Sequence, residues 1–497
     1  MTDGTEPIAP SPEGRVYKNH YSSVIQSMLS IILVLALMYM IWRMQWTEGE
    51  GVPRPLLYLL GIALVGYLYI VLRIWLKTTY DFGPNELTVT KDTLFKKVTN
   101  IQYSRMASVN VRRSIVNHIF GTTTLLFNVN SSVNSSRAEA MLTLPSDQAD
   151  ELREFVSSRI FQKEMVVEVE KEKPTLVHIS NMDVIMHGFF GQPTSTSLVG
   201  LASLAYSIIT LFTNSGGTLL AIVIFALSTA VPWVRTILRY YNYRVYRVDD
   251  TITVESGLIS NYRSSFKIGK VNSIRIREPL MARLMGKAML EAEVVGLADQ
   301  GGLPLLCPLK GKKVVLGLAD QLVPEFLIGE YDLGQPRQAA VPTMLRRIVP
   351  SLVSVAIGAA LFLAMERNGY YNDIMRYVTY AATAILIIAV PAVLLAHGML
   401  AQGRRGFAMG EETFMFVIGA YDLETDFIRY DKVQTATVSS GIVQRRFGVS
   451  QCTVSMMSSM GAKVIRSGTF LNEDLERVSA EVMARIRDGR YDYRRYL

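Results

Sequence analysis

The chain has 497 residues, of which 49% are apolar and 19% are charged, and its formal net charge is +8. A soluble domain carries roughly 25% charged residues, so this composition indicates that lipid buries part of the apolar surface. A mild positive excess suits an anionic membrane surface better than a DNA groove, and we expect no nucleic-acid partner. The two cysteines, Cys307 and Cys452, exclude a disulfide framework and a zinc site because no partner lies at motif spacing.

The chain begins with a predicted flexible tail, residues 1–23. Its first 14 residues carry Asp3, Glu6 and three prolines but no apolar run. A secretory signal peptide needs a basic region followed by an apolar one. We therefore expect a tail here and not a signal peptide.

Six apolar runs occur in three pairs, and each reaches or approaches the ~20 residues that a helix needs to cross ~30 Å of hydrocarbon. A single buried core helix could imitate one run but not three pairs. The pairs predict transmembrane hairpins at 24–76, 195–238 and 346–400, and hence a polytopic α-helical membrane protein. The runs are 24–42, 55–72, 195–212, 218–234, 348–365 and 377–400.

The charges around these runs predict the topology. The loops within the pairs hold four arginines that four acidic residues offset, whereas the outer flanks are basic. Basic flanks favour the cytoplasmic side of a membrane. We expect a multi-pass protein of the cell membrane whose N-terminus, C-terminus and three domains are all cytoplasmic. The basic flanks comprise Arg15, Lys18, Arg73, Lys77, Arg235, Arg239, Arg244, Arg346, Arg347, Arg404 and Arg405.

The spans carry no ionisable residue away from their ends, whereas ion and proton pathways usually contain one. Ala-Val-Pro recurs at Pro232 and Pro391, in the second helix of hairpins two and three. Broken helices can line transport sites, but proline is also common in membrane helices. The first hairpin lacks this proline, which favours the structural interpretation.

One β-rich pattern follows each hairpin, and its three copies align without a gap over 19 positions that end at Gly121, Gly286 and Gly448. Short alternating runs such as Ser108-Val-Asn-Val-Arg predict strands, and each glycine suits a turn into the next strand. The copies predict cytoplasmic domains at 78–163, 240–330 and 402–490.

Amphipathic helices are predicted to close the domains. Ser146 can cap the first and Asn472 the third, with apolar residues on one face. The helix of the second domain is doubtful because Pro324 would interrupt it. Residues 164–194 read as a linker that ends in a short interfacial helix over 180–190.

This strand-and-turn pattern resembles the bacterial pleckstrin-homology-like (PH-like) domains of multi-pass membrane proteins, and its triplication behind hairpins resembles the YdbT type. The resemblance implies β-sandwiches of seven strands, each capped by a C-terminal helix, and no established enzymatic activity. The third copy departs from the pattern, because Arg446 replaces the aliphatic Ile119 and Leu284.

The sequence offers little catalytic chemistry. Its five histidines form no metal-binding pair, and no phosphate loop or nucleophile motif occurs. We expect no catalytic, cofactor or metal site, hence no cofactor. A basic position recurs as Arg105, Lys270 and Lys432, with Arg112 and Arg113 nearby. These five are candidate contacts to anionic lipid, the alternative being solvated side chains at a sandwich edge.

These features predict a non-enzymatic, membrane-anchored PH-like interaction or scaffold protein. We expect it to assemble with itself or with a partner membrane protein, and the surroundings of the family suggest envelope maintenance or defence. A lipid-headgroup sensor and a lipid-handling transporter subunit remain the alternatives. The sensor requires dependence on anionic lipid, and the transporter requires a polar path through the helices.

Overall fold

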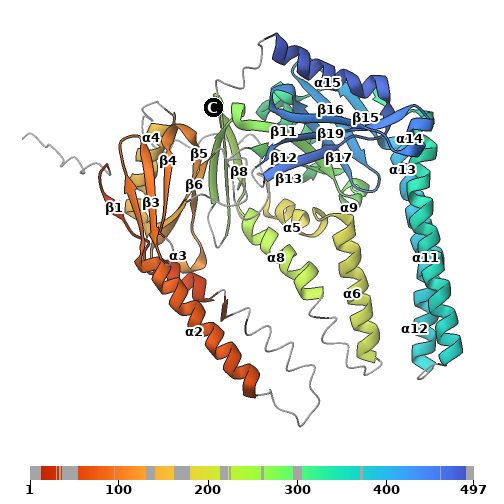
Figure 1. Ribbon diagram of the computed structural model, residues 1–497, viewed down its shortest axis with the longest axis horizontal. Coiled ribbons are helices and arrows are strands. Elements are labelled where there is room, and N and C mark those ends of the chain that lie inside the picture. The colour runs from red at the N-terminus through yellow and green to blue at the C-terminus, as the bar shows by residue number, and fades with distance from the viewer. Residues whose placement is uncertain are drawn as a thin grey trace, which may run out of the picture.

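Three β-rich domains lie in a row, and the long helices leave the row on one side (Figure 1). The first domain, in orange, forms one end of the row, and the third domain, in blue, lies toward the other. The computed structural model describes residues 13–29, 31–32, 35, 54–93, 96–129, 140–161, 179–212, 222, 225–258, 262–294, 305–369, 373–458 and 461–488.

The first domain packs two sheets and helix α4 (Ser146–Phe161) around one apolar core. One sheet has the order β1-β2-β3-β4, and the other begins β7-β6-β5. The core includes Phe82, Phe127 and Leu152, all fully buried. The remaining elements are β1 (Val16–Tyr17), β2 (Thr78–Phe82), β3 (Glu86–Asp92), β4 (Lys96–Gln102), η1 (Tyr103–Arg105), β5 (Met106–Arg112), α3 (Ile115–Ile119), β6 (Thr122–Val129) and β7 (Ala140–Pro145).

The second domain has the same two-sheet plan, and its closing helix is present. That helix, α10 (Lys312–Leu322), ends before Pro324, which begins the short helix η4 (Pro324–Phe326). The closing helix of the second domain therefore forms, and Pro324 lies beyond its end. The other elements are β8 (Arg244–Val248), β9 (Thr251–Ser256), β10 (Tyr262–Lys267), η3 (Ile268–Lys270), β11 (Val271–Glu278), α9 (Leu280–Leu284), β12 (Lys287–Val294) and β13 (Leu305–Gly311).

The third domain repeats the plan and ends in α15 (Asn472–Arg487), which begins at the residue predicted to cap it. Leu475 and Val478 on this helix are fully buried in the core. The other elements are β14 (Leu333–Gly334), β15 (Gly406–Met409), β16 (Thr413–Gly419), β17 (Leu423–Arg429), η7 (Tyr430–Lys432), β18 (Val433–Ser439), α14 (Ile442–Arg446), β19 (Val449–Ser458), β20 (Gly461–Arg466) and β21 (Phe470–Leu471).

The three aligned glycines share one backbone conformation. Gly121, Gly286 and Gly448 have φ values of 61°, 65° and 64°, in the left-handed region that favours glycine. The carbonyl of each glycine accepts a hydrogen bond from the backbone N–H of the first residue of the closing helix, at 3.1, 2.9 and 3.3 Å. The predicted turn is therefore present three times, and it also positions the helix.

Residues 13–23 lie against the first domain, although the sequence predicts a flexible tail over 1–23. Strand β1 pairs with β2, and the Asn19 Oδ1 accepts a hydrogen bond of 2.8 Å from the Thr143 N–H. Strand β14 pairs with β15 in the third domain in the same way. The segment before a hairpin thus completes the sheet that begins after it, because the edge of that sheet offers unpaired backbone groups.

The long helices are α2 (Arg54–Leu76), α6 (Thr194–Phe212), α8 (Val231–Tyr240), α11 (Ala340–Asn368), α12 (Asp373–Ala384) and α13 (Val390–Arg404). Among the described residues, two stretches are long and apolar enough to cross a membrane, Arg337–Arg367 and Arg376–Arg404. The six predicted spans are therefore not all confirmed. Much of the first and part of the fourth lie outside the described residues. The helix predicted over 180–190 is present as α5 (Asn181–Phe190), capped by Ser180, and its location at a membrane interface stays a prediction.

Each Ala-Val-Pro motif follows a π-helical turn, η2 (Ala226–Ala230) or η6 (Ile385–Ala389). A glycine of the preceding helix packs on each turn, Gly200 against Thr229 and Gly358 against Leu386 and Ile387. The Ser354 hydroxyl donates to the Leu386 carbonyl at 2.7 Å. A hydroxyl therefore satisfies a carbonyl near the proline, which supports the structural interpretation of these prolines.

Candidate functional site

Neighbouring domains are joined by shared β-sheets. Strand β5 of the first domain pairs with β10 of the second, and β11 of the second pairs with β17 of the third. The resulting sheets have the orders β7-β6-β5-β10-β9-β8 and β13-β12-β11-β17-β16-β15-β14. The sequence predicts three separate sandwiches, and the structure joins them into one row.

Ion pairs between partly or fully buried side chains reinforce the second joint. The Arg275 Nη1 lies 3.2 Å from the Glu424 Oε2, and the Arg277 Nε lies 3.5 Å from the Glu424 Oε1. Between β20 of the third domain and β12 of the second, the Lys463 Nζ lies 2.8 Å from the Glu293 Oε2, whose side chain is 1% exposed. Such pairs give geometric specificity to the joint, because a buried charge tolerates few alternative positions.

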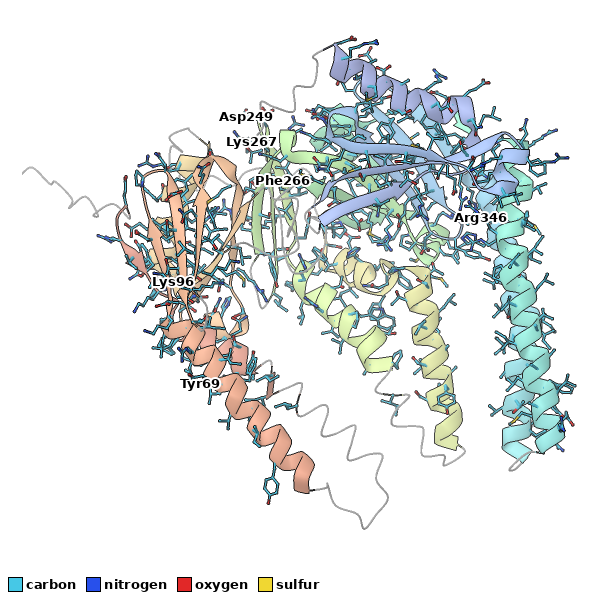
Figure 2. All side chains as sticks on the ribbon, viewed as in Figure 1. Tyr69, Lys96, Asp249, Phe266, Lys267 and Arg346 are labelled. Carbon is cyan, nitrogen blue, oxygen red and sulfur yellow. The ribbon has the colours of Figure 1, made fainter. Side chains whose placement is uncertain are left out.

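Two of the predicted lipid contacts, Lys270 and Lys432, lie close enough for their charges to interact. Burial lowers the pKa of Lys270, and the charges of Lys432 and Lys267 lower it further. Figure 2 places Lys267 at the side of the row opposite the helices. Lys270 belongs to η3, which directly follows Lys267, and its contact with lipid, like that of Lys432, stays a prediction. The side chain of Arg105 lies outside what the structure describes.

Arg112 and Arg113, at the end of β5, lie nearer the helices. Arg113 is engaged within the domain, since its Nε donates to the Thr123 hydroxyl at 2.8 Å and its Nη2 lies 3.5 Å from Asp150. Arg112 lines a cavity of about 550 Å³ between helix α2 and the first domain. Lys91 also lines this cavity, and no carboxylate does. We call it the first junction cavity.

A second junction cavity, of about 280 Å³, lies where α11 and the end of α13 meet the third domain. Four arginines and no carboxylate line it: Arg346, Arg347, Arg405 and Arg466. Figure 2 shows Arg346 at the end of α11 that meets the domain. The Arg346 Nη1 donates to the Gln451 Oε1 at 2.9 Å, and no described carboxylate forms an ion pair with any of the four.

The electrostatics of the second junction cavity favour an anion. Burial, together with the positive charges of Arg347 and Arg346, lowers the pKa of Arg405 to about 10. The Nε of Arg405 is buried without a hydrogen-bond partner. Like charges that crowd a half-buried space are stabilised by a multivalent anion, and arginine binds phosphate through paired donors.

No motif in the sequence marks this cavity. Arg346, Arg347 and Arg405 are predicted only as basic flanks of the membrane spans, and Arg466 belongs to no sequence motif. The four come from three separate segments, which only the tertiary fold brings together. The basic flanks were the one available hint, because they predict that these arginines lie at the boundary of a membrane.

Exposed apolar residues project from the short helix that follows β5, β11 and β18 in the three domains. Ile119 on α3 is 72% exposed, Leu284 on α9 is 74% exposed, and Ile442 on α14 is 90% exposed. Figure 1 shows α3 and α9 on the side of the row from which the long helices leave, and α14 at the end of the row beside α13. The position of Ile119 and Leu284 is solvent-facing, so Arg446 in the third domain does not disturb a core.

The comparisons with known proteins agree with this architecture. The sequence pattern of the bacterial PH domain matches residues 27–160, 197–321 and 350–488, each of which spans a hairpin and the domain after it. The chain belongs to the bacterial PH domain family. It is also 20% identical over 477 residues to the UPF0699 transmembrane protein YdbT of Bacillus subtilis (strain 168), covering 89% of this chain and 92% of that protein. No solved structure matches the chain.

These findings confirm the resemblance that the sequence suggested, including its triplication. A relative named as a transmembrane protein and two long apolar helices together support a membrane location for this bacterial PH domain protein. Membership of this family does not assign an activity, so the function is argued from the geometry of this chain.

Proposed function

We propose that the protein is a multi-pass membrane scaffold without enzymatic activity, which assembles with itself or with a partner membrane protein. The continuity of the sheets carries this proposal. Strand β11 pairs with β17 over six residue pairs, and β5 pairs with β10; both pairings are antiparallel. Backbone pairing fixes the distance and angle between domains, so the row is a platform with defined spacing.

The proposed topology has six spans, with the N-terminus, the C-terminus and the row of domains in the cytoplasm. The departure of all long helices from one side of the row and the basic flanks support it. Cytoplasmic reporter fusions after residues 90, 260, 415 and 497 should all be active. An exterior-type reporter that works at any of these four sites would contradict the topology.

The scaffold proposal is tested by the size of the protein in its own membrane. The full chain is extracted into nanodiscs with native lipid, and its mass is measured by mass photometry. We expect particles that contain more than one copy, or one copy with a stoichiometric partner. A uniform population of single chains would contradict the proposal.

Recognition of an anionic lipid headgroup is a second candidate function, which the junction cavities favour. Both cavities lie between long helices and a domain. Four arginines line the second, Lys91 and Arg112 are the charged residues that line the first, and no described carboxylate lines either. A headgroup at the membrane surface could enter there while its acyl chains remain in the bilayer. The exposed apolar residues Ile119, Leu284 and Ile442 would then lie near the same surface.

The lipid test compares two double variants with equal change in charge. Arg346→Gln with Arg405→Gln removes two arginines from the second junction cavity, whereas Arg445→Gln with Arg446→Gln removes two exposed ones from α14. Native mass spectrometry counts the anionic phospholipid retained by the full chain. We expect at least a twofold loss in the first variant and little change in the second. Equal losses would show that only net charge matters.

A further inference from the structure

The two joints between domains use one pairing rule. In each, the first strand of the second sheet of a domain pairs with the last strand of the first sheet of the next domain. The first joint is β5 with β10, and the second is β11 with β17. By this rule two strands have no partner domain among the described residues. They are β4, the last strand of the first sheet of the first domain, and β18, the first strand of the second sheet of the third domain.

Both joints also share one register. Arg112 pairs with Tyr262 in the first joint, and Arg277 pairs with Glu424 in the second. The glycine alignment offsets the second module by 165 residues from the first and the third by 162 from the second. These offsets place Arg277 at the position of Arg112 and Glu424 at the position of Tyr262, so the two pairs are equivalent. The adjacent pairs, Val111 with Arg263 and Ile276 with Thr425, are equivalent in the same way.

The unused strands are open edges. Within the part of the chain that the structure describes, β4 pairs only with β3, and β18 pairs only with β19. Val98 on β4 is 51% exposed, and β18 has neither proline nor any charged residue. Proteins normally protect an edge strand with charges, proline or a covering segment. Lys96 and Lys97 protect only one end of β4.

The shared register predicts which residues of β18 and β4 would be directly opposite if these two strands formed a third joint. Applying the same offsets pairs Ser439 with Lys97, Val438 with Val98 and Thr437 with Thr99. The last two are like pairs of β-branched residues, which stabilise antiparallel strands when directly opposite. Thr437 and Thr99 occupy the positions that Arg275 and Asp426 occupy in the second joint.

We propose that β18 of one chain pairs with β4 of a second copy of the same chain, in the register that the two internal joints already use. This inference rests on the proposed scaffold function and names its partner and surface. The two edges belong to domains at opposite ends of the row, so the contact is head-to-tail (Figure 1). A head-to-tail contact forms a ring if it closes and an open row if it does not. Hairpins that all leave on one side keep every copy in one membrane plane.

The test is cysteine cross-linking of the full chain in membranes. One tagged copy carries Val98→Cys, and a second copy with a different tag carries Val438→Cys. Directly opposite strand residues have Cα atoms ~4.5–5.5 Å apart, which suits a disulfide. We expect a cross-linked species with both tags on mild oxidation, and a ladder of dimer and larger species when one chain carries both substitutions. The native Cys307 and Cys452 are fully buried.

The matched controls lie on the opposite edges of the same two sheets. Val16→Cys replaces Val98→Cys, and Val464→Cys replaces Val438→Cys; these residues are 61% and 56% exposed. We expect less than one tenth of the cross-linking from either control. In addition, Val98→Asp should remove the assembled species in nanodiscs while Val16→Asp retains it, since an unpaired charge would enter the joint.

The outcomes separate this inference from the proposed function. If the protein assembles but gives no Val98–Val438 cross-link, or cross-links equally through the control edges, the proposed pairing of β4 with β18 is wrong. The proposed scaffold function would still stand. Cross-linking of either edge to a different protein in place of the second copy would also overturn the proposed strand pairing. A protein of single chains in nanodiscs would overturn both.

Discussion

Arg275 and Asp426 meet across the joint between the second and third domains, with the Arg275 Nε 2.7 Å from the Asp426 Oδ1 and the Nη2 3.2 Å from the Oδ2. The two residues are also directly opposite in the strand register, and the Asp426 side chain is fully buried. Burial alone would lower the pKa of Arg275, but Asp426 raises it above its ordinary value. Ion pair and strand pairing thus specify the same alignment of the two domains.

The first prediction concerns this pair. Asp426→Asn removes the fully buried carboxylate and leaves Glu424, 3.2 Å from the Arg275 Nη1, as the remaining charged partner. Losing the charged hydrogen bonds to Asp426 should destabilise the joint by about 2 kcal/mol. Hydrogen exchange of the full chain in detergent should show loss of protection in β11 and β17 and little change in the first domain. Asp150→Asn is the control, because its partner Arg113 is 3.5 Å away and Asp150 is 58% exposed. A surface pair of that kind contributes ~1 kcal/mol or less.

The second prediction concerns the third hairpin. A Cβ on Gly358 would lie 2.7 Å from the Ile387 Cγ1 and 3.0 Å from the Leu386 Cβ. Gly358→Leu should therefore separate α11 from η6 and lower the midpoint of thermal unfolding in detergent. Gly61→Leu in α2 should have little effect, because nothing lies within 4 Å of the added Cβ. Equal melting of the two variants would show that the helices of the third hairpin do not pack as described.

The sequence predicted the features that depend on local pattern. The repeated glycine turns, the closing helices at Ser146 and Asn472, and the short helix before the second hairpin are all present. Each depends on residues within about one turn or one strand, where propensity and periodicity act. Pro324 made the second closing helix doubtful because sequence shows a helix breaker but not where the helix has already ended.

The features that the sequence did not predict arise from contacts between distant segments. The joints combine strands more than 140 residues apart, such as Ile276 with Thr425, and an edge strand carries no mark of its partner. The second junction cavity likewise gathers arginines from α11, from the residue after α13 and from β20. The sequence shows that Arg105, Lys270 and Lys432 occupy one recurring position, but it does not show on which side of each domain that position lies.

The third prediction concerns the two native cysteines. Burial raises the pKa of Cys307 to about 12 and that of Cys452 to about 11. Only the thiolate reacts with disulfide reagents, so the folded chain at pH 8 should release no thiol signal with such a reagent. Denaturation should release two equivalents per chain. Val16→Cys, as an exposed control outside the proposed joint, should add one equivalent that reacts before denaturation.

The last prediction concerns His187 on α5, which is buried against the second domain and packs edge-to-face on Tyr240 with ring centroids 5.4 Å apart. Burial lowers the pKa of His187 from 6.5 to about 4, and the charge of Arg277 acts in the same direction. The unfolded chain therefore takes up the proton first as the pH falls. The stability that neutral His187 contributes is fully present above pH 6.5 and is lost between about 6.5 and 4.

The loss over that interval should be on the order of 3 kcal/mol, since one pKa unit corresponds to about 1.4 kcal/mol. His187→Phe keeps the ring contact and cannot take up a proton, so it should unfold with a weaker dependence on pH below 6.5. Denaturant unfolding of the full chain in detergent, at several pH values from 7.5 to 4.5, measures this slope. The two proteins compared at pH 7.5 serve as the control for packing, because both rings are uncharged there. An unchanged slope in the variant would assign the acid sensitivity to other groups.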